Sequence, residues 1–405
     1  MKLPALHWQI LTAFILAILT GIFFPPVVPY VDWMGTVFIR LLKMVIIPLI
    51  LSSIISGLTN IGSAENLGRL GLKTIAYYML TSLLAITTGL VLVNILKPGV
   101  NADLGLSQNV DKLGIAGQSF GDTLLKVIPD NIFASLMQAD MLGIIFFALI
   151  FGFFITRIGG KHGKLLSDFF NAVFEVMMKI TLFIIRFTPL GVFGIVAGVV
   201  ASNSNLLEVA SRLSIYMAAV LAGLFIHATI SLPLLVRIIA RVNPFKHLSA
   251  VSTALLTAFS TSSSSATLPL TMTSVENNDG VSNKISSFTL PLGATINMDG
   301  TALYEIVAAI FIAQAYGLEL TLTKQIIVVF TALLASIGAA GIPMAGLVMI
   351  SVILSAIGLP LEGVGLILAV DRILDMFRTS VNVWSDTCGA IIIAKSEGED
   401  LKVKI

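Results

Sequence analysis

Charged residues are scarce in this chain of 405 residues. Asp, Glu, Lys and Arg make up 11% of it and hydrophobic residues 57%, whereas an ordinary soluble domain has about 25% charged residues. So few charges cannot cover a water-facing surface, and most of the exterior must therefore face lipid. The composition excludes a soluble globular protein. A net charge of +2 without clusters of Lys and Arg also argues against nucleic acid as a partner.

Cysteine and histidine are nearly absent. The single cysteine, Cys388, excludes a disulfide within the chain and a thiolate cage for a metal, and four scattered histidines give no zinc-binding pattern. No cofactor is expected. A membrane-embedded serine hydrolase is an alternative from another class, but no G-x-S-x-G motif occurs, and the only histidine well inside an apolar run, His227, is interpreted as a packed residue. The sequence predicts a protein that is not an enzyme.

Long hydrophobic runs stand where the charges are missing. About 20 apolar residues in a helix cross the hydrocarbon core of a membrane. The first run follows Lys2 without a small-residue cleavage pattern, so it is interpreted as a retained helix and not as a signal peptide. The Lys and Arg bias between loops predicts a cytoplasmic N-terminus. The six expected helices cover residues 6–25, 33–60, 68–97, 122–157, 165–201 and 207–240.

The apolar runs become short after about residue 245. Small-residue segments at 260–269 and 338–346 interrupt them, and each lies between apolar arms too short to cross a membrane twice. Irregular backbone at membrane depth must be buried in protein or line a cavity, so each segment predicts the tip of a re-entrant hairpin rather than a flexible linker. Longer helices follow at 285–316 and 364–396, and such paired broken segments are typical of transporters. The expected fold is an all-α integral membrane protein with eight transmembrane helices and two re-entrant helical hairpins.

The last of these helices carries a polar stripe. With about 100° per residue, Asp371, Asp375, Arg378, Asn382 and Asp386 fall on one face. A charge facing lipid at the bilayer centre costs about 2.5–3.5 kcal/mol, so the stripe is expected to point into the protein. A face of ion pairs that only locks helices together is the alternative.

Oxygen-bearing side chains form two further groups. The run Asn297-Met298-Asp299-Gly300-Thr301 favours an unwound turn, and freed carbonyls beside an acid suit Na⁺. Tyr78, Thr81 and Ser82 share a helix face, although most such hydroxyls only bond their own backbone. Glu305 is a further acid at membrane depth, which can take up and release a proton or remain permanently paired or protonated.

Four motifs carry a resemblance to a known family. They are SSSSATLPLTM at 262–272, NMDGTALYE at 297–305, ASIGAAGIPMAG at 335–346 and DMFRTSVNVWSD at 375–386. With them the whole chain resembles the dicarboxylate/amino acid:cation symporters, the family of the glutamate transporters and their prokaryotic homologues.

The resemblance implies a homotrimer that works by elevator-like alternating access. A scaffold domain would comprise residues 1–65 and 120–204, and a transport domain residues 66–119 and 205–398, followed by a cytoplasmic tail at 399–405. Within the transport domain the first hairpin covers about 245–279, and the second hairpin, about 322–358, is the extracellular gate.

The resemblance also implies a substrate site. Arg378 would pair with the side-chain carboxylate of the substrate, Asp375 would hold its ammonium group, and tip residues such as Ser264 would bind its α-carboxylate. The matching positions are Ser262, Ser263, Ser264, Thr301, Ile342, Gly346, Asp375, Arg378, Thr379 and Asn382.

Three Na⁺ sites are implied in the same way. One would use Asp386 with groups at Gly293, Asn297 and Asn382. A second would use Tyr78, Thr81, Ser82, Asn297 and Asp299. A third would use Met298 with backbone at Ser336, Ile337 and Ala339.

Two positions resemble particular branches of the family. Neutral amino-acid members lack an arginine at Arg378, so an acidic substrate is expected, and Glu305 matches the proton-carrying residue of the animal glutamate transporters. One feature departs from the family, which usually supplies a second substrate-site arginine from either the first hairpin tip or the last helix. In this chain those two positions are Ser262 and Met376. Arg372, one turn before Met376, is the candidate substitute.

The sequence thus predicts a symporter that takes up glutamate or aspartate with Na⁺ and H⁺. It would lie in a cell inner (plasma) membrane, among lipids, with both termini cytoplasmic. A C4-dicarboxylate:cation symporter of the same fold is the alternative, and an anion channel is a further one.

Overall fold

A computed structural model describes residues 6–62, 68–100, 102, 128–138, 140–202, 206–318, 320–338 and 345–403 of the chain. Every regular element within these ranges is helical, which confirms the all-α prediction.

The first three expected helices are present. A proline-rich 3₁₀ turn, η1, separates the first two, because Pro25, Pro26 and Pro29 cannot donate the hydrogen bonds of a continuous α-helix. The elements are α1 (Leu6–Phe23), η1 (Pro25–Tyr30), α2 (Asp32–Gly62) and α3 (Gly68–Leu96).

The next two expected helices are both interrupted. Part of the expected helix 122–157 lies outside the described residues, and the rest divides before Asp140. The expected helix 165–201 begins earlier and bends by 51° after Ile185. The bend comes just before Pro189, whose ring disrupts a continuing helix. The elements are α5 (Ile132–Gln138), α6 (Met141–Ile158), α7 (Gly160–Ile185) and α8 (Thr188–Ser202).

The sixth expected helix is continuous but contains two π-helical segments. It ends at Arg241, which adopts the left-handed conformation with φ 53°. Its parts are α9 (Leu206–Ile226), η3 (His227–Ser231), α10 (Leu232–Leu235) and η4 (Val236–Ala240).

The first hairpin has the predicted helix–turn–helix order. The Asn243 side chain accepts hydrogen bonds from the backbone N–H groups of Phe245 and Lys246 and so caps its first arm. Ser262, with φ 51°, makes the turn. Its elements are α11 (Pro244–Thr261), α12 (Ser264–Ser274) and η5 (Val275–Asp279).

The remaining helices follow the predicted positions. The expected helix 285–316 divides in two, and the tip of the second hairpin lies outside the described residues. The elements are α13 (Asn283–Ile296), α14 (Asp299–Ala315), α15 (Leu322–Gly338), α16 (Ala345–Ala356), η6 (Leu361–Gly363) and α17 (Val364–Ser396).

Length and apolar composition identify fewer spans than the eight expected. Within the described residues, four helices are long and apolar enough to cross a membrane, or five if α7 and α8 form one bent span. Helix α17 has 33 residues but carries the polar stripe. The structure therefore supports a helical membrane protein with several apolar helices.

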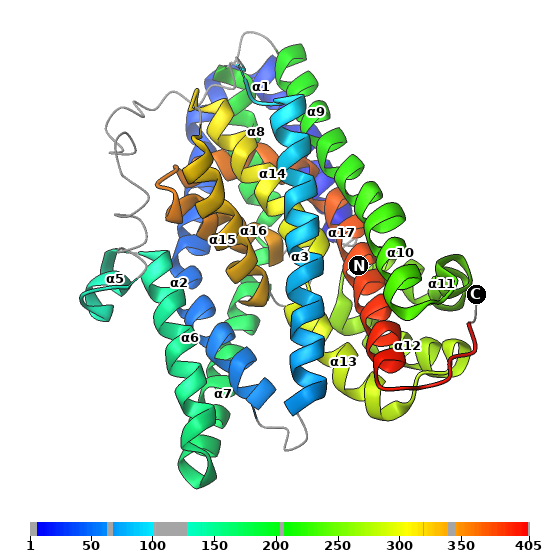
Figure 1. Cartoon of the computed structure of the whole chain (residues 1–405). Helices are drawn as coiled ribbons and strands as arrows, with labels where there is room; N and C mark the ends of the chain where they lie inside the picture. The colour runs from blue at the N-terminus through cyan, green and yellow to red at the C-terminus, as the bar shows by residue number, and fades with distance from the viewer. Residues whose placement is uncertain are drawn as a thin grey trace, which may run out of the picture.

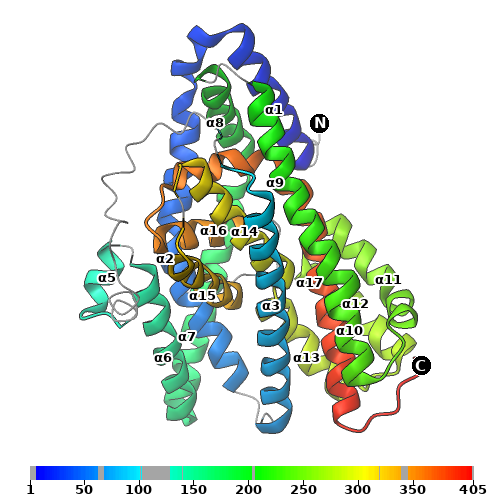
Figure 2. The ribbon, with the colours of Figure 1, turned by 45° about the horizontal axis from the view of Figure 1, so that its top comes forward.

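Helix α14 lies at the centre of the molecule. It packs against α3, α9, α15, α16 and α17, and every residue from Asp299 to Ala313 is buried. In two views, α2, α6 and α7 lie on one side of α14 and α10 to α13 on the other (Figures 1 and 2). The polar motifs of α13, α14 and α17 are thereby enclosed by other helices.

Candidate functional site

The helix break between α13 and α14 is the unwound turn that the sequence predicts. Asn297 and Met298 have non-helical backbone angles, with ψ values of 87° and 53°. The preceding turn approaches α17 closely: a Cβ atom on Gly293 would lie 2.4 Å from an Asp386 carboxylate oxygen. Only glycine fits there, so backbone and carboxylate oxygens are brought together.

Asp299 is the centre of the larger oxygen cluster. Its Oδ1 accepts hydrogen bonds from Ser82 Oγ at 2.7 Å and Thr81 Oγ1 at 3.3 Å. Its Oδ2 accepts one from Ser385 Oγ at 2.6 Å and lies 3.1 Å from Nε2 of His227. The structure thus joins residues of α3, η3, α14 and α17 around one buried carboxylate, and Thr81 and Ser82 lie where the sequence predicts.

Asp386 forms a second, adjoining cluster. Asn297 donates from Nδ2 to Asp386 Oδ1 at 2.9 Å and to Ser385 Oγ at 3.0 Å. Because Ser385 also bonds Asp299, the two acids belong to one connected network. Asp386, Asn297 and Gly293 therefore lie together, as predicted.

Two of the predicted cation residues bond elsewhere. The Tyr78 hydroxyl donates to the carbonyl of Thr289 at 2.7 Å, although it remains near Gly293. The Asn382 side chain accepts from the Gly300 backbone N–H at 2.8 Å and donates to Thr301 Oγ1 at 3.2 Å. Asn382 thus holds the first turn of α14 against α17.

The third predicted cation site is described only in part. Met298 is buried, and its sulfur lies 3.7 Å from Nδ2 of Asn382. Ser336 and Ile337 belong to the last turn of α15, while Ala339 lies beyond the described residues. Ile342, predicted for the substrate site, also falls outside them.

The serines of the first hairpin surround the beginning of α12. Ser263 caps this helix by accepting a hydrogen bond from the Ala266 backbone N–H at 3.2 Å, and Ser264 begins it. All three tip serines are buried, and the Ser262 hydroxyl has no hydrogen-bond partner. Ser263 caps one backbone N–H group of the first turn. The other N–H groups at a helix N-terminus have no partner within the helix, and such groups suit a carboxylate.

Arg378 is a buried cation between two carboxylates. It donates to Asp371 at 3.0 Å and to Asp375 at 2.7 Å, and its guanidinium lies 3.8 Å from the ring centroid of Tyr304. A Cβ atom on Gly346 would lie 3.0 Å from Nη1, so the start of α16 also faces it. Thr379, the next residue of α17, is buried as well.

Arg372 reaches the same carboxylate from the other side. Its Nη1 lies 3.5 Å from Asp375 Oδ2, and its side chain is 20% exposed. Asp375 therefore faces two guanidinium groups, one buried and one accessible. Arg372 thus lies beside the predicted substrate residue Asp375, and its role as a substitute for the missing arginine stays a prediction.

Glu305 lies one residue beyond Tyr304 on α14. Its side chain is fully buried, and neither carboxyl oxygen has a hydrogen-bond partner. An ionised carboxylate in such a place is costly. Arg378 is the charged group that acts on it electrostatically.

Sequence reasoning missed two members of this network. Ser385 precedes Asp386 in the last motif, and its position beside an acid was the available signal. His227 was interpreted as a packed residue, whereas it contacts Asp299 directly. A histidine in an apolar helix was its signal, but no local pattern points to α14 as its partner.

The chain is similar to a known protein family and to several individual proteins. Residues 6–396 match the sodium:dicarboxylate symporter family, whose members are transporters and not enzymes. The chain is 38% identical to excitatory amino acid transporter 3 of Mus musculus over 98% of this chain and 87% of that protein. It is 39% identical to the Homo sapiens protein of the same name, over 92% and 80% of the two chains. It is 37% identical to an excitatory amino acid transporter of Caenorhabditis elegans, over 93% and 83%. This chain therefore belongs to the sodium:dicarboxylate symporter family.

Proposed function

We propose that this protein takes up acidic amino acids, glutamate or aspartate, by symport with Na⁺ and H⁺. The observation that carries the proposal is the buried arginine, Arg378, about two turns of α17 before the buried acid Asp386. Asp386 forms one network with a further buried acid, Asp299. A planar guanidinium suits a substrate carboxylate. Oxygen ligands beside unwound backbone suit the coupling cation.

The coupling cation is supported by the donor set. Around Asp299 the groups are three hydroxyls and the imidazole of His227, with the Asn297 amide and the Asp386 carboxylate adjoining them. The oxygens in this set are hard ligands of the kind that alkali cations prefer. Proton coupling is supported by Glu305, because a carboxyl group buried without a partner is readily kept neutral and can exchange a proton when the site opens.

An elevator mechanism in a homotrimer completes the proposal. Helix α2 packs against α6, α7 and α8, whereas α14 packs against α3, α9 and α17. These two groups correspond to the proposed scaffold (1–65 and 120–204) and transport domain (66–119 and 205–398). Both termini would be cytoplasmic, and the hairpins would enter the membrane from opposite sides.

The proposal is tested with purified protein in liposomes, where gradients of Na⁺, H⁺ and K⁺ are imposed one at a time. Labelled glutamate or aspartate should accumulate only with an inward Na⁺ gradient, and equal uptake in choline would refute Na⁺ coupling. Glu305→Gln should flatten the pH dependence of uptake. An unchanged pH profile would remove the role of Glu305 while leaving Na⁺ coupling intact.

One observation favours a C4-dicarboxylate as the substrate instead. Both oxygens of Asp375 already face a guanidinium, from Arg378 and Arg372, and a dicarboxylate without an amino group needs no ammonium partner. Competition decides: aspartate should displace labelled substrate better than succinate if Arg372 yields Asp375 to an ammonium group.

A further inference from the structure

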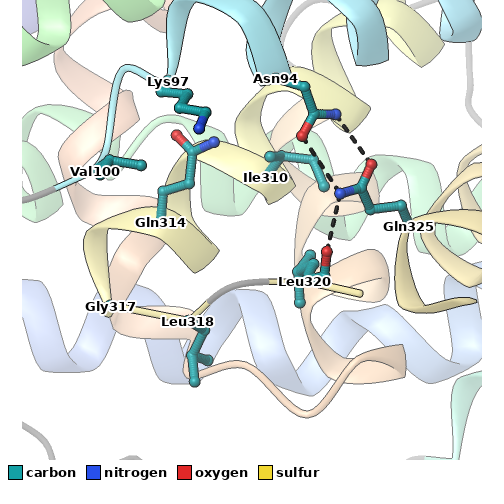
Figure 3. Close-up of a pocket in the computed structure, with 9 residues that line it drawn as sticks. All are labelled: Asn94, Lys97, Val100, Ile310, Gln314, Gly317, Leu318, Leu320 and Gln325. Carbon is teal, nitrogen blue, oxygen red and sulfur yellow. Dashed lines mark hydrogen bonds between the residues drawn. The ribbon is translucent and has the colours of Figure 1, made fainter. Parts of the chain in front are cut away.

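A cavity of about 320 Å³ lies far from the site described above. It is bounded by the end of α3, the end of α14 and the beginning of α15 (Figure 3). Gln314 of this cavity and Asp299 stand at opposite ends of α14, 15 positions apart, which corresponds to about 22 Å along a helix. The cavity is therefore separate from the Asp299 network.

One wall of the cavity presents hydrogen-bond donors. The Gln314 Oε1 atom accepts a hydrogen bond from the Gly99 backbone N–H at 3.1 Å, which fixes the side-chain amide so that its NH₂ group is the end left for a ligand. The Lys97 ammonium lies beside Gln314 (Figure 3), and no described residue pairs with it. Two unused donors, one of them charged, thus face the same space.

The opposite wall presents acceptors. Asn94 Nδ2 donates to the Leu90 carbonyl and to Gln325 Oε1, and Gln325 Nε2 donates to the Leu320 carbonyl and to Asn94 Oδ1. Both NH₂ groups are therefore fully used. Each carbonyl oxygen keeps a second lone pair, so this wall can accept a hydrogen bond but has none left to donate.

Apolar side chains complete the lining of the cavity. Ile310, Leu318 and Val100 line the cavity together with the amides. Lys97 is the one charged side chain among the described residues that line it, so a ligand that balances the charge carries a net negative charge or an anionic group.

We propose that this cavity is a second ligand site, for a molecule that carries an anionic oxygen group and an ammonium group a few ångströms apart. The anionic group binds Lys97 and Gln314, and the ammonium group binds the oxygens of Asn94 and Gln325. An acidic amino acid matches the pattern in charge and size. The proposed ligand contacts are with Lys97, Gln314, Asn94 and Gln325 and use no carboxylate, so we expect binding without Na⁺.

Two sources can supply this chemistry. One is a free acidic amino acid in the medium, and the other is a phosphoethanolamine lipid headgroup, whose phosphate and ammonium have the same arrangement. The first gives saturable binding that is independent of the lipid, and the second gives a lipid that stays with the purified protein.

The test measures binding of labelled glutamate to the whole chain in nanodiscs of phosphatidylcholine, in choline buffer without Na⁺. Wild-type protein should bind, and Lys97→Gln should weaken binding about tenfold because a charge-assisted hydrogen bond is lost. Gln314→Leu should also weaken glutamate binding, and Lys97→Arg, which keeps the charge, should retain most of the wild-type affinity. Because the buffer contains no Na⁺, this binding is separated from binding at the proposed Na⁺-coupled transport site.

Lys324→Gln is the matched control, because it removes the same charge from α15 beside the cavity without changing its lining. Absence of Na⁺-independent binding together with absence of a retained phosphoethanolamine lipid would overturn the proposal. An equal loss in Lys324→Gln and Lys97→Gln would do the same. A phosphoethanolamine lipid seen by native mass spectrometry on wild-type protein but not on Lys97→Gln would support the site and assign it to the headgroup. The proposal stands or fails independently of Na⁺-driven uptake.

Discussion

The two halves of the described chain differ in what they bury. Between residues 6 and 202 the described part has no buried Asp, Glu, Lys, Arg or His side chain, and its buried polar groups are hydroxyls. Between residues 206 and 403 nine side chains of these types are buried. They are His227, His247, Asp279, Asp299, Glu305, Asp371, Asp375, Arg378 and Asp386.

Buried hydroxyl groups are used in two different ways. In α2, Ser53 and Thr59 each donate to a carbonyl three residues earlier in their own helix. Ser82 of α3 and Ser385 of α17 instead donate to Asp299, a carboxylate of the second half on another helix. Hydroxyls that bond their own helix only satisfy the backbone, whereas hydroxyls that converge on a buried acid from several helices form a site. The difference separates packing from function among chemically identical side chains.

Replacing the buried cation is expected to have the largest effect. Arg378→Thr removes the buried cation that Asp371 and Asp375 share, and breaking a buried pair costs about 3–5 kcal/mol, or about 10²- to 10⁴-fold. Uptake of labelled glutamate should fall by that factor, and uptake of neutral amino acids should rise. Arg40→Thr makes the same change on the exposed side of α2 and should leave uptake within about twofold. Unchanged acidic selectivity in Arg378→Thr would show that Arg378 does not bind the substrate side chain.

Removing the charge of Asp299 is expected to have the second-largest effect. Asp299→Asn keeps the shape of the side chain but removes the anion that four groups surround, so half-saturation by Na⁺ should rise about 30-fold or more. Asp32→Asn is the control, because Asp32 is an exposed residue at the beginning of α2. The measurement is the Na⁺ dependence of uptake in liposomes. If both variants kept wild-type Na⁺ dependence, the Asp299 network would only stabilise the packing of helices, like the hydroxyls of α2 that bond their own backbone.

Ser385 and Ser53 test whether a hydroxyl that bonds a buried acid differs in function from one that bonds its own helix. Ser385→Ala removes a hydrogen bond that orients Asp299, and losing a group that orients an ion ligand typically costs about tenfold or more in affinity. Ser53→Ala removes a bond within α2 and should change Na⁺ half-saturation by less than about twofold. Equal effects from the two variants would contradict the distinction between packing and site hydroxyls.

Part of this arrangement could be predicted from the sequence. The polar stripe of α17 was predictable because charges are so rare that their helical spacing is visible, and the break at Asn297 followed from residues that disfavour helix. The interruption before Asp140 was overlooked, because hydropathy averaged over a long apolar run hides a short polar segment.

Contacts between distant segments could not be predicted. The approach of His227 to Asp299 depends on how η3 packs against α14, and the contact of Tyr304 with Arg378 depends on how α14 packs against α17. Local spacing places residues on a helix face, but it does not identify the partner that this face meets. The eight spans predicted from the sequence stay a prediction, because buried charges make α17 unlike an apolar span in composition.

The smallest expected effect is on stability, and it concerns an ion pair that lies outside both the Asp299 network and the Arg378 cluster. Glu397, just after α17, accepts hydrogen bonds from Arg69 and Lys73 of α3 at 2.7 and 2.6 Å, and these lower its pKa to about 2. A carboxylate with a lowered pKa stabilises the folded state fully above its usual pKa of about 4.5, and this contribution is lost as the pH falls from there towards 2. The melting temperature of wild-type protein in detergent should exceed that of Glu397→Gln by a small, constant amount from pH 8 to pH 5, and the gap should narrow by pH 3. High salt should narrow it too, because exposed pairs are screened. A difference in melting temperature that widens as the pH falls would mean that Glu397 acts through something other than its charge. A loss of stability as large as that caused by Arg378→Thr would show that exposure does not separate weak ion pairs from strong ones in this protein.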